Sequence, residues 1–121
     1  MIVFHFFIQT IDPGFVAYDM HVSFEVDENH TPVNVELSVD GTENIKCLAF
    51  IPTLQVNEAN HMLPKNLVFM KVFFDAIDLG VSVKAMIAIE FDVDNDNNIY
   101  DLDIEVFHHE NLRQCVFSAS S

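Results

Sequence analysis

The chain has 121 residues, which is enough for one domain with a single hydrophobic core. Half of the residues are hydrophobic, and 19 Asp and Glu stand against five Lys and Arg, so the formal net charge is -14. This acidic excess argues against direct nucleic-acid binding, which depends on Lys and Arg contacts to phosphate. It argues equally against attachment to anionic membranes through a basic segment.

The first segment, residues 2–9, reads IVFHFFIQ and is apolar on both faces of a strand. Such a strand belongs in the middle of a sheet or buried in a dimer. The segment lacks the basic n-region and the small-residue cleavage site of a signal peptide. The nearly apolar run at residues 81–89 is too short to span a membrane. We therefore expect a cytoplasmic location.

Alternating apolar and polar residues predict an antiparallel hairpin from residues 15–26 and 33–40, after an Asp-Pro-Gly turn signal at 12–14. The Asp-Gly dipeptide that ends this hairpin predicts a tight turn into a third strand at residues 45–51. These three strands would form a meander in one sheet.

Residues 66–79 are predicted to form a helix. Asn66 suits an N-cap and Gly80 suits the position just after a helix C-terminus, and the length between them is that of an ordinary helix. The Val, Phe and Ile content of the same segment favours a strand, so the local signals compete.

The same alternation predicts a second hairpin from residues 81–93 and 99–107, followed by a short strand at 112–117. No internal repeat is apparent. We predict a single domain over residues 1–121 that is mainly β, with α+β as the alternative. Its architecture would be an antiparallel sheet, sandwich or partly open barrel of about six or seven strands with one helix near residues 66–79.

The acids from Asp92 to Asp103 resemble the calcium loop of EF-hand proteins, with Asp92, Asp94, Asp96 and Asp103 at ligand positions. The segment departs from that loop at Asn97, where glycine normally makes the sharp turn. Its flanks also have the period of strands instead of helices. An ordinary Asp- and Asn-rich hairpin loop is therefore the expected structure, with calcium binding as the alternative.

Other reactive residue types occur without a pattern that supports a site. His108 and His109 are adjacent, so on a strand they point to opposite faces and cannot easily share a metal ion. Cys47 and Cys115 lack the CxxC spacing of metal or redox motifs, and two free thiols are expected. The chain also lacks a GxSxG elbow and a phosphate-binding glycine loop. We expect no catalytic residues, no metal and no cofactor.

Along residues 90–106, acidic residues alternate with apolar ones and no Lys or Arg intervenes, which predicts one acidic face on a strand pair. Carboxylates on one strand recur every ~6.6 Å, so two neighbouring strands approach the ~3.4 Å charge spacing of a DNA strand. The acids expected to bind a partner are Asp92, Asp94, Asp96, Asp101, Asp103, Glu105, Glu25 and Glu36.

Size, charge and the missing catalytic motifs predict a non-catalytic acidic binding protein that neutralises a basic protein partner. The most concrete forms are an immunity protein or antitoxin that blocks a toxin nuclease, and an inhibitor that mimics nucleic acid. An alternative is a structural or homodimeric subunit that associates through the N-terminal strand, with calcium at the Asp92–Asp103 loop as a stabiliser. A third explanation is that the acidity only keeps a Phe-rich domain soluble.

Overall fold

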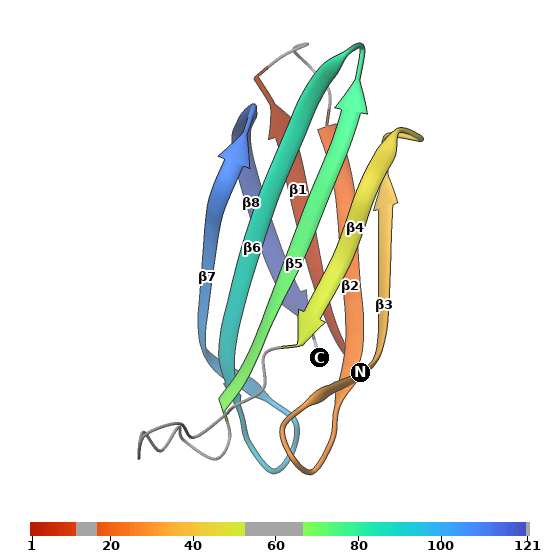
Figure 1. Ribbon diagram of the computed structural model, residues 1–121. Helices are drawn as coiled ribbons and strands as arrows, with labels where there is room; N and C mark the ends of the chain where they lie inside the picture. Colours follow the sequence, from red (N-terminus) through yellow and green to blue (C-terminus); the bar gives the residue numbers. More distant parts are fainter. Residues whose placement is uncertain (12–16, 53–66, 121) are drawn as a thin grey trace, which may run out of the picture.

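The computed structural model describes residues 1–11, 17–52 and 67–120, which form eight strands in two facing sheets (Figure 1). Sheet A contains, in spatial order, β3 (Pro32–Asp40), β2 (Ala17–Val26), β1 (Ile2–Thr10) and β8 (Leu112–Ser120). Sheet B contains β4 (Ile45–Pro52), β5 (Leu67–Asp78), β6 (Val81–Val93) and β7 (Ile99–Glu110). All strand pairs are antiparallel. The prediction of a mainly β antiparallel fold is confirmed, with eight strands and, in the described residues, no helix.

The hydrophobic core lies between the two sheets and takes every second residue of the inner strands, because successive side chains of a strand point to opposite faces. Phe4 of β1 packs against Phe24 of β2 and against Phe91 of β6, with ring centroids 5.6 Å apart in each pair. The largest fully buried side chains come from both sheets: Tyr18, Phe4, Phe6, Phe24, Phe74 and Phe91.

The predicted helix at residues 66–79 is wrong, because this segment forms β5 (Leu67–Asp78). Every second residue from Val68 to Asp78 is buried, and the strand pairs with β4 on one edge and β6 on the other. Its β-branched and aromatic residues suit that environment. The expected N-cap, Asn66, lies outside the described residues.

The predicted three-stranded meander is also wrong, because β4 leaves sheet A and pairs with β5 in sheet B. The chain crosses between the sheets at Gly41, which has a φ of 108°. A Cβ built at Gly41 would lie 2.4 Å from the carbonyl oxygen of Ala17. Only glycine fits this close approach to the β2 backbone.

The other strand predictions are confirmed. β1 lies in the middle of sheet A and pairs with β2 and β8, so its two hydrogen-bonding edges are both used. The hairpins β2–β3 and β6–β7 and the last strand, β8, are present. The expected turn at residues 12–14 lies outside the described residues.

The two halves of the molecule follow the same path, so the expectation of no internal repeat is wrong at the level of the fold. In each half, three strands form a meander in one sheet and the fourth crosses to the other sheet: β1–β3 then β4, and β5–β7 then β8. The strand pairings also correspond. Ile2 faces Phe24 as Val68 faces Phe91, and the Ile77 amide donates to the Asn44 carbonyl as the Ile11 amide donates to the Asn111 carbonyl, both at 3.1 Å.

The correspondence extends to irregular positions. Asn34 of β3 and Asp101 of β7 occupy equivalent bulges, with φ values of 54° and 52°. Short sequence matches accompany it: residues 24–27 read FEVD and residues 91–94 read FDVD. The fold is therefore a structural repeat of four strands, and the paired strand residues of one half have counterparts in the other.

Candidate functional site

The outer face of sheet B carries the acids predicted on β7. Asp103 and Glu105 are both exposed, and they lie across from Glu90 and Ala88 of β6. Glu90 and Asp103 therefore form a directly opposed pair of like charges, which is destabilising in a sheet. Within the described residues, no Lys or Arg side chain forms an ion pair with a carboxylate.

Asp101 does not continue this row, which corrects the expectation that one uninterrupted alternation places all these acids together. A bulge at Asp101 shifts the pairing, so that Asp92 faces Tyr100 while Glu90 faces Asp103. Asp101 lines a shallow cleft toward β8 with Ala119 and Ser120. A bulge re-aims the side chains beside it, and here it spreads the acids around the edge of the sheet.

The two hairpin loops at one end of the molecule have the same geometry. In the β2–β3 loop, Asp27 Oδ1 accepts hydrogen bonds from the amides of Asn29 and Thr31, each at 2.9 Å. In the β6–β7 loop, Asp94 Oδ1 accepts hydrogen bonds from the amides of Asp96 and Asn98, at 2.9 and 2.8 Å. Asx turns of this kind fix the chain reversal through the carboxylate.

These hydrogen bonds also set the charge of the β6–β7 loop. The Asn98 amide is the strongest influence on Asp94, and hydrogen bonds from the Asn98 side chain and the Asp96 amide add to it. Together they outweigh desolvation and hold the pKa of Asp94 below its usual range. The loop therefore stays anionic well into acidic pH.

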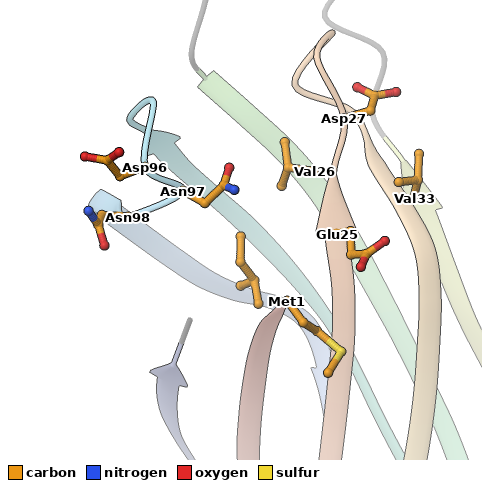
Figure 2. Close-up of a pocket in the computed structure, with 9 residues that line it drawn as sticks. Met1, Glu25, Val26, Asp27, Val33, Asp96, Asn97 and Asn98 are labelled. Atoms are coloured by element: carbon orange, nitrogen blue, oxygen red, sulfur yellow. The ribbon is translucent and has the colours of Figure 1, made fainter.

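A cleft of about 620 Å³ lies between these two loops (Figure 2). Glu25, Asp27 and Asp96 line it together with Met1 and Asn97, so the structure brings two predicted partner-binding acids, Glu25 and Asp96, to one place. Figure 2 shows the carboxylates of Asp27 and Asp96 on opposite sides of the cleft, pointing away from its middle. The arrangement spreads negative charge over the rim of the cleft.

Glu36 lies apart from the acids of β7. It is exposed on β3 of sheet A, across from Ser23, and sheet A presents the opposite outer face of the molecule. The predicted partner-binding residues thus fall into four groups: the outer face of sheet B, the hairpin end, Asp101 at the edge toward β8, and Glu36. One partner surface can cover the first two groups together, because both involve β6 and β7.

The described residues contain no group of three or more His, Cys, Asp or Glu side chains arranged to hold a metal ion. His108 and His109 are both exposed on β7, and His108 lies at a second bulge with a φ of 50°. The thiols are free: Cys47 is exposed, while burial raises the pKa of Cys115 to about 11.

Two polar clusters were missed at the level of the sequence. On the outer face of sheet A, the rings of His5 and His21 stack at 4.4 Å, and His5 Nε2 lies 2.9 Å from Asp19 Oδ1. The alternation places these residues outward, but their contact depends on the register of β1 against β2. Only the paired structure shows it.

The second cluster joins the two sheets through Asp78 at the end of β5. The Tyr18 hydroxyl donates to Asp78 Oδ2, while Thr42 Oγ1 and Asn44 Nδ2 donate to Oδ1 at 2.8 and 2.9 Å. Burial acts to raise the pKa of Asp78, but these hydrogen bonds outweigh it and the pKa is lowered. Burial, and then the bond to Asp78 and its charge, raise the pKa of Tyr18.

Comparison with protein-family models, with curated proteins and with solved structures gives no match for this chain. Among the described residues, no helix is long and apolar enough to cross a membrane. The surface chemistry therefore supplies the argument for function.

Proposed function

We propose that this protein is a non-catalytic acidic binding protein that neutralises a basic protein partner. The observation that supports it best is the grouping of uncompensated carboxylates on β6, β7 and the hairpin end, where no described Lys or Arg pairs with them. The most concrete form is an immunity protein or antitoxin that blocks a toxin nuclease, in the cytoplasm, or an inhibitor that mimics nucleic acid.

The spacing of these acids suits a partner that binds nucleic acid. Neighbouring strands lie ~4.8 Å apart and same-face residues ~6.6 Å apart, which gives a density of charge comparable to that of phosphates. Complementary charge of this kind raises association rates and excludes wrong partners more than it adds affinity.

A second candidate is a structural or homodimeric subunit. Phe7 of β1 and Val116 of β8 are directly paired on the outer face of sheet A and are 39% and 49% exposed. Because both edges of β1 are already paired, a second copy would have to contact this face rather than extend the sheet at β1.

The test begins with capture of a partner from an extract on the immobilised protein, followed by identification of the bound protein. Association rates are then measured against a variant with Asp101→Asn, Asp103→Asn and Glu105→Gln, which removes three charges and keeps the side-chain shapes. Asn also tolerates the left-handed φ of position 101. We expect association to slow about tenfold at low salt and to depend less on salt.

A matched control removes three charges elsewhere: Glu36→Gln, Asp40→Asn and Glu43→Gln. This variant should leave the association rate nearly unchanged if β7 carries the contact. If the control slows association instead, the interface lies on sheet A. A third variant, Glu25→Gln with Asp96→Asn, removes two acids of the hairpin end. If none of the three variants changes the rate or its salt dependence, the charge serves solubility and the proposed function is wrong.

A further inference from the structure

The outer face of sheet B contains a hollow of about 290 Å³ at Ala88. Ala88 lies between Lys71 and Glu105 in the strand register, and the next row across the sheet is Phe69, Glu90 and Asp103. The small side chain of Ala88 forms the floor, while its larger neighbours form the walls. The hollow is thus apolar at its base and Phe69 side, with three carboxylates and the Lys71 side chain around it.

An apolar row borders this hollow. Ala49, Phe73, Met86 and Phe107 are paired in sequence across all four strands of sheet B. The ammonium of Lys71 lies over the Phe107 ring, 5.9 Å from its centroid, and forms no ion pair with a described carboxylate. Lys71 also lines the hollow, but the three acids around it form no ion pair with a Lys or Arg of the described part of the chain.

The equivalent place in sheet A is filled. The counterpart of Ala88 is His21, which stacks at 4.4 Å on His5, the counterpart of Lys71. Ser23 stands where sheet B has Glu90, and Ser38 where it has Glu105. The same backbone therefore accommodates large or neutral side chains here.

This difference bears on what the hollow is for. Sheet B keeps the unfavourable opposition of Glu90 and Asp103, while sheet A avoids it with Ser23 opposite Glu36. Sheet A shows that the fold does not require opposed carboxylates at this position, so a ligand that compensates the charge would give their presence in sheet B a physical reason.

We propose that the hollow at Ala88 binds an Arg or Lys side chain of the protein partner, with apolar neighbours of that residue lying along the Phe73–Phe107 row. The inference rests on the proposed function and names the contact through which the acidic surface would recognise its partner. The hollow is at or below the ~300–1,000 Å³ typical of small-molecule pockets, so one side chain suits it better than a metabolite.

The chemistry of the walls selects this occupant. The aliphatic stem of a cationic side chain can pack on Ala88 and Phe69 while its charged group reaches Glu90, Asp103 and Glu105. A cation near an aromatic face gains further attraction, and hydrogen bonds between charged groups are stronger than neutral ones. A guanidinium can bind a carboxylate through two parallel hydrogen bonds, so Arg should bind more tightly than Lys.

The test uses the full-length ¹⁵N-labelled protein and two capped five-residue peptides of equal charge. One alternates Val with Arg and the other alternates Gly with Arg. With millimolar peptide, we expect amide shifts at Phe69, Ala88 and Glu90 and none at His21 or Ser23. The Val-containing peptide should bind more tightly, because only it can use the apolar row.

Ala88→His copies into sheet B the residue that fills the equivalent place in sheet A, without removing a carboxylate. At pH 8, where an imidazole is mainly neutral, this variant should bind the Val–Arg peptide about tenfold or more weakly than wild type. Ala17→His is the matched control, since it adds the same side chain to the outer face of sheet A and should not change binding.

A second pair of variants tests the role of the carboxylates and does not depend on whether the Ala88→His variant folds. Glu90→Gln with Asp103→Asn should lower the affinity for the peptide to a similar extent, while Glu36→Gln with Asp40→Asn should leave it unchanged. If the shifts fall on the hairpin loops and Ala88→His binds as well as wild type, the hollow is not the site, although the acidic surface can still bind a partner. Absence of any shift also overturns this inference, and the proposed function is then judged separately by the association rates with the captured partner.

Discussion

At equivalent positions of the repeat, Phe24 in the first half and Phe91 in the second are both fully buried, whereas Ser23 and Glu90 beside them differ in charge. The inner positions of the two inner strand pairs are buried in both halves because both sheets pack against the same core, although their sizes can differ, as with Tyr18 and its counterpart Ala85. The outer positions have no such constraint. Comparison of the two halves therefore separates residues that serve the fold from residues that are free to serve binding.

The largest effect on stability is expected in the core, where equivalent substitutions in the two halves should destabilise the protein by similar amounts. Phe24→Ala and Phe91→Ala each remove a ring that packs on Phe4, so each should destabilise the protein by about 3–5 kcal/mol. Urea unfolding measures both, and Val116→Ala on the exposed face should change stability by less than about 0.5 kcal/mol. If one Phe variant lost less than about 1 kcal/mol, the two halves would not share the core equally.

The next effect tests the crossings between the sheets. Gly41→Ala should destabilise by about 3 kcal/mol, because the new Cβ would meet the Ala17 carbonyl at 2.4 Å in a backbone conformation that suits glycine. Gly80→Ala is the matched control. Gly80 also has a positive φ, but nothing lies within 4 Å of an added Cβ, so about 1 kcal/mol is expected. Equal losses, measured by thermal or urea unfolding, would show that backbone strain alone matters at Gly41.

The alternation of apolar and polar residues with a period of two made most strands predictable. Predictions from local sequence failed where the structure depends on pairing with strands distant in the sequence. The outer face of β5 carries Phe69 and Phe73, which hides its alternation, and Gly80 is as suitable after a helix as in the tight turn between β5 and β6. The Gly41 turn is equally compatible with a meander and with a crossing. In both cases the deciding contacts come from strands far away in the sequence.

The acids of the site could be predicted, but their grouping could not. Exposure of Asp103 and Glu105 follows from alternation with half-buried apolar neighbours, while the bulge at Asp101 becomes visible only in the register of β6 and β7. The repeat could not be predicted from the sequence for a related reason. Matches such as Asp27 with Asp94 are few, and the stretch from Ile2 to Phe24 is one residue shorter than the equivalent stretch from Val68 to Phe91, so the halves do not align without a gap.

A smaller effect is expected from the polar cluster that joins the two sheets at Asp78, since the counterpart of Tyr18 in the other half is Ala85, which has no hydroxyl. Tyr18→Phe removes the hydrogen bond to the Asp78 carboxylate and should cost about 2 kcal/mol at neutral pH, as judged by urea unfolding. Thr42 and Asn44 continue to donate to Asp78, which limits the loss. A change below about 0.5 kcal/mol would mean that water replaces the hydroxyl without cost.

The same cluster predicts a pH dependence of stability. The folded pKa of Asp78 is lowered, so its contribution is present above the unfolded value of about 3.9 and is lost as the pH falls through the folded pKa. The folded pKa of Tyr18 is raised, so its contribution is present below about pH 10 and is lost as the pH rises above it. Stability measured from pH 7 to 11 should therefore fall less steeply for Tyr18→Phe than for wild type. Parallel curves would contradict this assignment.

The smallest effect concerns the two hairpin loops, which share one geometry but differ in their acids. We expect millimolar calcium to leave the melting temperature unchanged. The oxygens of Asp94 already accept hydrogen bonds from the loop amides, as those of Asp27 do in the other half, and Asp103 lies on β7 opposite Glu90 instead of closing around the loop. A real site at about 100 times its Kd would add about 2.7 kcal/mol and raise the melting temperature by several degrees. A rise that was abolished by Asp94→Asn with Asp96→Asn, but not by Asp27→Asn, would show that the β6–β7 loop binds calcium. The two loops would then share their backbone geometry but not their function.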